Sequence, residues 1–196
     1  MRYVAFAALM LMFAGCSRTE DEALSMERAD QARVTYYQAF SRFVLEDDFE
    51  SISYIFSDPQ PVVSLESAEQ PESYRFVWLR SFESPLLITV LVEGEQGRLN
   101  LREAPAAYGP GTLLRNETAL LTPAQLQNLR NVVQSNPFWQ EERPQTTGGR
   151  DGSVWFVEVK QQGRFYKGQE WEPKQGSPIR AIGVCLLELS RYPLEN

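Results

Sequence analysis

The 196-residue chain contains no histidine. That absence excludes Ser-His-Asp and Cys-His catalytic arrangements, zinc sites that use histidine, and the side chain most used for proton transfer near neutral pH. The phosphate-binding loop pattern with its Lys and Ser/Thr is also missing, as is the alternating Asp/Asn pattern of a calcium loop. We therefore expect no metal, no cofactor and no enzymatic activity.

Cysteine is nearly absent as well, since only Cys16 and Cys185 occur. If Cys16 is chemically modified, Cys185 is the single remaining thiol and no intramolecular disulfide can form. A lone cysteine of this kind is either buried and inert or available for pairing between molecules. Its apolar neighbours Ile182, Leu186 and Leu189 favour a buried thiol.

Basic residues are outnumbered, with 19 Lys and Arg against 26 Asp and Glu and a formal net charge of −7. This balance argues against nucleic acid as a partner, because phosphates require a basic surface. It also disfavours a polybasic contact with anionic lipid. The hydrophobic content of 43%, with 11 Phe, 8 Tyr and 4 Trp, is sufficient for a packed core.

Long apolar runs are missing except at the start of the chain. Residues 3–14 are apolar throughout and follow Arg2, and Ala14-Gly15-Cys16 closes the run. Such a run is shorter than the roughly 20 residues that a membrane-spanning helix needs. Its length is typical of the core of a signal peptide.

This segment resembles the type II signal peptide of a bacterial lipoprotein, in which small residues precede an acylated cysteine. The resemblance implies cleavage before Cys16 and attachment of acyl chains such as palmitate to it. Two or more acyl chains anchor a protein stably, so we expect membrane attachment at Cys16. Ser17, rather than Asp, follows the cysteine and indicates the outer membrane, facing the periplasm. The alternative is an ordinary secretory signal that is cut at another small residue.

The chain then divides into three parts: a signal peptide over residues 1–15, a polar tether over residues 16–23, and a globular domain over residues 24–196. Residues 104–111 contain two prolines and two glycines and are a candidate boundary within the domain.

The first half of the domain predicts a helix over residues 24–45 and then a series of short strands. Ile52, Tyr54 and Phe56 alternate with other residues and predict a strand. The remaining strands are expected over residues 74–79, 86–92, 98–103 and 112–121, as an antiparallel meander.

The second half predicts a helix, a β-hairpin and a second helix. Thr122 and Gln125 form a capping box for the first helix, and Ser177 caps the second. Strands over residues 153–160 and 164–171 form the hairpin, joined through residues 161–163, where Gly163 supplies the positive φ of the turn. The fold class is therefore α+β, an antiparallel strand meander followed by helix–β-hairpin–helix.

The C-terminal half carries a series of short sequence motifs. These are Leu121-Thr122 with Gln125-Leu126, Phe138-Trp139, Asp151-Gly152 with Trp155 and Glu158, then Gly163, Phe165, Trp171 and Pro173. The pattern resembles that of a family of uncharacterised bacterial proteins, which implies a shared fold and no assigned activity. The chain departs from it at Tyr166 and Glu170, where His and Arg are expected.

The most site-like segment is the glycine-rich stretch over residues 148–152. Arg150 and Asp151 in this loop, with Trp155 as an apolar wall and Glu158 as a desolvated acid, are the candidate binding residues. The alternative is a plain connector into the hairpin, with Glu158 in a structural cross-strand pair. In the expected register Tyr166 lies opposite Glu158, with Lys167 one step away.

Three functions stay open. The first is a non-catalytic, membrane-anchored envelope component that binds another protein. The second is a lipoprotein that binds a small ligand or inhibits a hydrolase, and the third is a carboxylate-based hydrolase. The secure anchor and the missing catalytic motifs favour the first.

Overall fold

A computed structural model describes most of the domain. The described residues are 22–28, 30–31, 34–35, 38–44, 46, 49–57, 62–67, 69, 72–106, 112–136 and 151–193.

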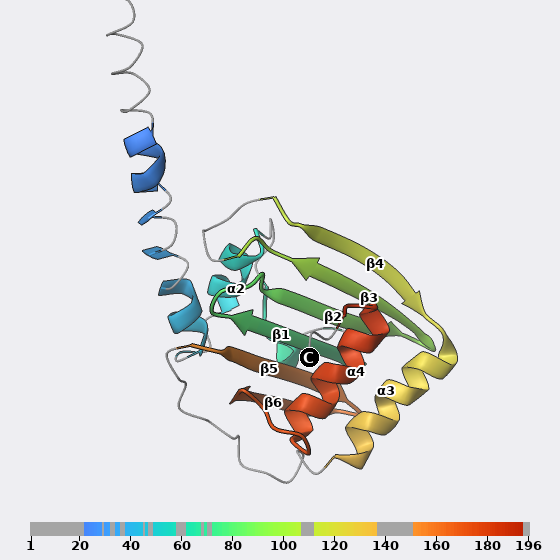
Figure 1. Cartoon of the computed structure of the whole chain (residues 1–196). Coiled ribbons are helices and arrows are strands. Elements are labelled where there is room, and N and C mark those ends of the chain that lie inside the picture. The colour runs from blue at the N-terminus through green and yellow to red at the C-terminus, as the bar shows by residue number, and fades with distance from the viewer. Residues whose placement is uncertain are drawn as a thin grey trace, which may run out of the picture.

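A six-stranded sheet with strand order β4-β3-β2-β1-β5-β6 organises the domain (Figure 1). Every neighbouring pair of strands is antiparallel. The strands are β1 (Glu72–Arg80), β2 (Leu86–Glu93), β3 (Gln96–Glu103), β4 (Arg115–Leu121), β5 (Ser153–Gln161) and β6 (Arg164–Trp171). β1 and β5 pair in the middle of the sheet, although more than 70 residues of sequence separate their paired positions, such as Arg80 and Ser153.

Helices cover both faces of this sheet. The helices α3 (Pro123–Ser135) and α4 (Pro178–Ser190) pack on one face, as Figure 1 shows. The other face is covered by the helical residues 38–44, by α2 (Phe49–Ile55) and by the short helix η1 (Leu65–Ser67). The predicted α+β class, with a strand meander followed by helix–β-hairpin–helix, is confirmed.

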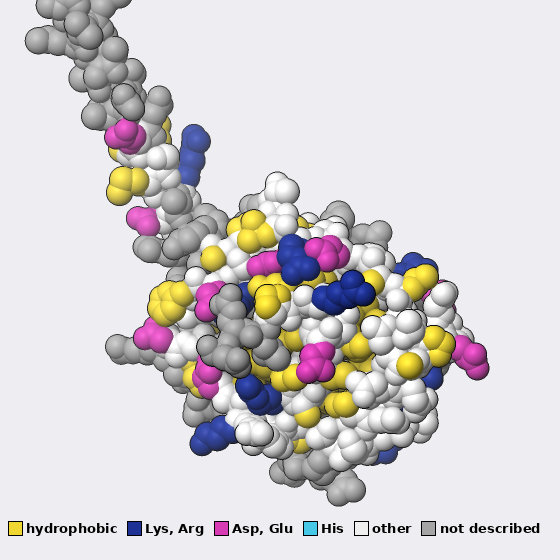
Figure 2. Space-filling model, turned by 45° about the vertical axis from the view of Figure 1, so that its right-hand side comes forward, with side chains coloured by type: hydrophobic (Ala, Val, Ile, Leu, Met, Phe, Trp, Pro, Cys, Tyr) yellow, Lys and Arg dark blue, Asp and Glu magenta, His cyan; other side chains and the backbone are white. Residues whose placement is uncertain are grey.

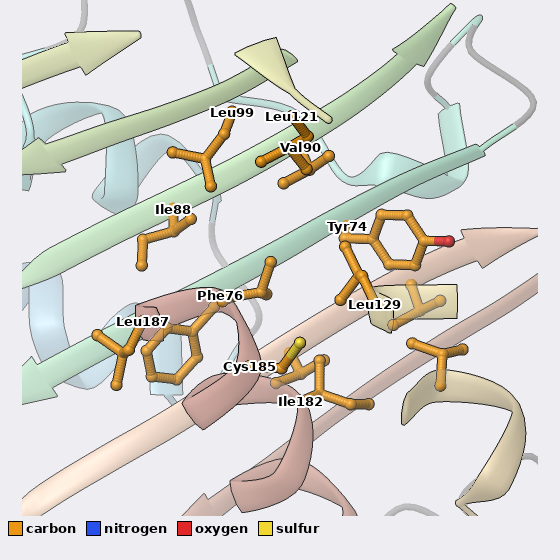
Figure 3. Packing of buried hydrophobic residues seen from close by; sticks show 14 of the residues in the cluster. Tyr74, Phe76, Ile88, Val90, Leu99, Leu121, Leu129, Ile182, Cys185 and Leu187 are labelled. Carbon is orange, nitrogen blue, oxygen red and sulfur yellow. The ribbon is translucent and has the colours of Figure 1, made fainter. Parts of the chain in front are cut away.

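The alternation of β1 divides the core into two layers. Tyr74 and Phe76 point toward α3 and α4, where they pack with residues such as Ile88, Ile182 and Cys185 (Figure 3). Val77 and Leu79 point the other way and join the layer beneath residues 38–44 and α2. Because successive side chains of a strand face opposite sides, one central strand serves both layers.

The prediction of a strand around Ile52, Tyr54 and Phe56 is wrong. This segment forms α2 and the turn after it, with Ile52, Ile55 and Phe56 buried. Residues three and four apart lie on one face of a helix. The spacing from Ile52 to Ile55 and Phe56 therefore buries a continuous apolar face that a strand would have split between two faces.

The predicted helix caps are confirmed. The Thr122 Oγ1 accepts a hydrogen bond from the Gln125 N–H at 3.2 Å, and the Gln125 side chain accepts from the Thr122 N–H at 2.9 Å. The Ser177 Oγ accepts from the Arg180 N–H at 3.4 Å, at the start of α4. Such bonds satisfy the first N–H groups of each helix, which have no partner within it.

The hairpin between β5 and β6 is one residue tighter than predicted. Its turn consists of Gln162 and Gly163, with φ of 52° and 73°, which is the backbone of a two-residue hairpin turn. Gln161 therefore pairs with Arg164. Because the turn is one residue shorter, the pairing of β5 with β6 also shifts, and Glu158 lies opposite Lys167 and not opposite Tyr166.

The candidate boundary at residues 104–111 joins two strands of one sheet, because β3 and β4 pair along their whole length. Residues 107–111 lie outside the described part of the chain. Among the described helices, none is long and apolar enough to cross a membrane.

Candidate functional site

Of the binding residues predicted from the sequence, Trp155 and Glu158 lie on opposite faces of the sheet and do not share a site. Arg150 lies outside the described residues, as does Cys16, the residue at which lipidation is expected. Asp151 is exposed just before β5. Trp155 is 3% exposed and packs in the core beneath α4, whereas Glu158 is fully buried on the opposite face of the sheet.

Trp155 is a packing residue and not the wall of an open loop. Its ring centroid lies 5.0 Å from those of Phe76 and Trp78. A Cβ atom placed on Gly183 of α4 would lie 2.6 Å from Trp155 Cε3, so the helix sits directly on the ring. The alternation of β5 sends Trp155 and Glu158 to different layers, which is why the two cannot meet.

Glu158 anchors the segment that carries η1. Its Oε1 accepts hydrogen bonds from the Ser64 Oγ at 2.7 Å and from the Leu65 N–H at 3.3 Å. Its Oε2 accepts from Arg75 Nη1 at 2.7 Å, and the same Nη1 donates to the Val63 carbonyl at 2.8 Å. The carboxylate therefore ties residues 63–65 to β1 and β5.

Burial raises the pKa of Glu158, and the Arg75 guanidinium and the Ser64 hydroxyl oppose that rise. A raised pKa is one mark of a catalytic acid. Here, however, both oxygens are taken by donors from the protein, and the side chain is fully buried. Residues 63–65 would have to move before a substrate could reach it.

The most open part of the described sheet is its edge strand β4. The five residues 116–120 are all exposed, with Leu120 at 60%. A strand that packs one face on the core alternates buried and exposed residues, and β4 does not. Neither face of this edge is covered along residues 116–120.

The positions of the helices explain this exposure. α3 begins at Pro123, immediately after β4, and α4 ends at Ser190, beside β3 and β4. Only Leu121, the last residue of β4, is buried, where it packs with Leu126 of α3. The two helices thus cover the sheet from β3 to β6 and leave residues 116–120 of β4 exposed.

A groove of about 580 Å³ runs between β4 and the end of α4. Its apolar lining includes Leu99, Leu101, Ala119, Leu121 and Leu189. Its polar lining includes Glu117, Gln125 and Arg191. Figure 2, in which this side of the molecule is turned forward, shows hydrophobic side chains gathered in a hollow with charged side chains around them. We call residues 116–120 and this groove the β4 surface.

The charges of the β4 surface are unevenly paired. Glu117 accepts two hydrogen bonds from Arg115, at 2.8 and 3.0 Å. The Arg191 guanidinium, by contrast, makes no ion pair with any described residue. The hydrogen bonds from Arg115 lower the pKa of Glu117.

The opposite edge, β6, is better protected. Gln169 Nε2 donates to the Val44 carbonyl at 2.8 Å, which joins this strand to the helical residues 38–44. Tyr166 and Gly168 are buried. Of the two sheet edges, β4 is therefore the one that the described residues leave open.

The sequence predicted a strand at residues 112–121 but not its exposure. The available signal was composition, because Arg115 to Ala119 contains no large apolar residue and cannot support a half-buried strand. Among the described residues, no group of three or more acidic or cysteine side chains is placed to hold a metal. Comparison with models of known protein families and with curated proteins finds no match to the chain.

Proposed function

We propose that the chain is a lipid-anchored protein of the bacterial cell envelope that binds another protein through the β4 surface and catalyses no reaction. The observation that carries the proposal is the β4 edge, which is exposed over five consecutive residues and lies beside a partly apolar groove. An uncovered edge strand offers backbone groups that another chain can pair with.

The anchor follows from the start of the sequence. Ala14-Gly15-Cys16 ends the apolar run and resembles a lipoprotein cleavage site. Residues 22–28, which come soon after, are helical, and all seven are exposed (Figure 1). An exposed start of the domain, directly after the expected tether over residues 16–23, suits an anchor that holds the sheet and its helices away from the lipid. Ser17 favours the outer membrane, on its periplasmic side.

The arrangement supports a protein partner better than the two alternatives. The small-ligand hypothesis relied on Trp155, which is buried in the core. The hydrolase hypothesis needs two accessible acids, and Glu158, a described acid with a raised pKa, is enclosed by Arg75 and Ser64. The β4 surface needs no rearrangement to be reached.

The proposal is tested by photo-crosslinking in intact bacterial cells that make the full chain. A crosslinking amino acid at the exposed Thr118 is expected to give a discrete protein adduct, and the same group at the exposed Lys174 is not. The Cys16→Ser variant should lose the acylated mass of the N-terminus and the adduct together, because it leaves the membrane. Equal adducts at the two positions, or an unacylated Cys16 in the parent protein, would contradict the proposal.

A further inference from the structure

We propose that the partner supplies an extended acidic segment that adds to β4 as a seventh strand, with apolar side chains in the groove and a carboxylate beside Arg191. This inference rests on the proposed function and names the chemistry of the partner.

The first argument is the backbone of β4. β3 pairs with only one side of this strand, over all seven residues from Arg115 to Leu121. Proteins usually block such an edge with Lys, Pro or a bulge, and β4 contains neither Lys nor Pro. Its two charged residues, Arg115 and Glu117, neutralise each other at one end. An extended chain is the natural complement of the unpaired backbone groups.

The second argument is the shape of the groove. Alternate residues of an added strand would point to the same side of the sheet as Glu117 and Ala119, which line the groove. Ala119 is exposed, and its small side chain leaves the groove open from the edge. Leu99, Leu101 and Leu189 form an apolar lining beyond it. Apolar side chains at every second position of the segment therefore fit this face.

The third argument is charge. Arg191 in the groove makes no ion pair with a described residue, and the same holds for Arg98, which lies opposite the exposed Leu120 on the other face of the sheet. At least one cation thus stands near the open edge on each face. Both favour carboxylates on the incoming segment.

A second copy of this chain fits less well than another protein. A second β4 would bring Arg115 and Glu117, which are already paired within the chain. The formal net charge of −7 also opposes association of two copies. A short acidic segment meets the local cations without bringing a second acidic domain beside the first.

The test uses the full lipidated chain in detergent micelles to select from a display library of random peptides about ten residues long, enough to span a strand of this kind. Enriched peptides are expected to alternate apolar and polar residues and to carry Asp or Glu. A fluorescent copy of one such peptide is then titrated with the protein, and binding is followed by anisotropy. N-methylation of alternate peptide bonds should abolish binding, because it removes backbone donors.

Protein variants locate the contact. Ala119→Arg and Arg191→Glu are each expected to weaken binding about tenfold or more, because they fill the groove or reverse its charge, whereas Arg191→Lys should retain most of the affinity. Lys174→Glu, at an exposed position near the start of α4, is the matched charge-reversal control and should change nothing. Circular dichroism and thermal unfolding check that Ala119→Arg, a change at an exposed residue, leaves the fold intact.

Three outcomes would overturn the inference: no enrichment of peptides, enrichment of basic or non-alternating peptides, or binding that is indifferent to Ala119→Arg. These outcomes differ from a failure of the proposed function. A crosslinked partner at Thr118 in cells would still support protein binding, even if the partner does not bind as an added strand.

Discussion

At the scale of single residues, Arg75 and Glu158 form an ion pair in which both side chains are buried. Arg75 is 6% exposed and Glu158 is fully buried, so neither charge can be screened by water once its partner is removed. The desolvation cost of a buried pair can cancel its attraction, but an unpaired buried charge is strongly destabilising. The pair therefore affects stability mainly through the buried charge that remains when one member is substituted.

We expect Glu158→Gln and Arg75→Met each to lower the free energy of unfolding by about 3 kcal/mol, because each removes the nearest opposite charge from a buried charged side chain. The double variant should cost clearly less than the sum of the two single changes. Urea unfolding of all four proteins measures the coupling, with Glu93→Gln, at an exposed residue of β2, as the control. Additive losses would mean that the pair is not coupled.

Cys185 shows how far a residue's surroundings can be inferred from its neighbours. The predicted burial is confirmed, since the thiol lies in the core and is 3% exposed. Burial raises its pKa to about 11, which keeps it protonated and unreactive at neutral pH. Helical spacing from Ile182 and Leu189 was enough to predict this, because one face of α4 meets the sheet.

At the scale of elements, the contact between α4 and the sheet depends on one glycine. A Cβ on Gly183 would lie 2.6 Å from Trp155 Cε3 and 2.9 Å from Phe76 Cε2, and both of these rings are buried. Glycine costs a helix up to about 1 kcal/mol relative to alanine. Forcing a methyl group into a packed core costs typically about 1–3 kcal/mol. The cost of the added methyl group should exceed the gain in helix propensity, so that replacing Gly183 by alanine lowers the stability of the domain.

Gly183→Ala is therefore expected to destabilise the domain by about 1–2 kcal/mol despite its better helix propensity, because the added methyl group would clash with two buried rings. Thermal unfolding measures the change. In a Trp155→Phe background, where the ring is smaller at the contact, the same substitution should cost less. An equal or larger cost in that background would show that the clash with Trp155 is not the cause.

Local signals predicted most elements well, and long-range packing decided the rest. The caps at Thr122 and Ser177 act within one turn of helix, so the sequence alone was sufficient to predict where α3 and α4 begin. The segment around Ile52 has a spacing compatible with either a helix or a strand, and only its burial beneath residues 38–44 settles it as α2.

The candidate site was harder to predict than the fold. Trp155 and Glu158 are three residues apart in sequence, yet strand alternation places them in different layers of the core. The Arg75–Glu158 contact joins residues that are 83 apart. The composition of β4 indicates a strand that is not half-buried, but the groove beside it depends on where α3 starts and where α4 ends on the sheet, which no window of sequence contains.

At the scale of the whole molecule, the layer formed by α3 and α4 is joined to the sheet by a polar cluster at the start of β1. Arg130 of α3 donates two hydrogen bonds to Glu72, each at 2.8 Å, and the Tyr74 hydroxyl donates to the same carboxylate. Gln161 Nε2 donates to the Tyr74 hydroxyl at 3.2 Å, which adds β5 to the cluster. One carboxylate thus connects α3, β1 and, through Tyr74, β5.

Partial burial alone would raise the pKa of Glu72, but the hydrogen bonds from Arg130 and Tyr74 outweigh it, and the pKa lies below its ordinary value of 4.5. A lowered pKa means that the unfolded chain takes up this proton first as the pH falls. The stability contributed by Glu72 is then fully present above pH 4.5 and is lost as the pH falls through the lower value. The pH dependence is opposite for Glu158, because its pKa is raised. The stability that this side chain contributes is therefore lost as the pH rises.

The directions of these pKa shifts predict how the stability of the domain changes in acid. Glu72→Gln should lower the free energy of unfolding at neutral pH, because Arg130 loses its charged partner, and should bring the variant closer to the parent as the medium is acidified below the ordinary carboxyl range. Urea unfolding of both proteins at a series of pH values measures this difference, and comparison at each pH removes the contribution of Glu158. Glu93→Gln is the control, since its side chain is exposed at the end of β2. A pH-independent difference between Glu72→Gln and the parent would mean that the charge of Glu72 does not stabilise the contact between α3 and the sheet.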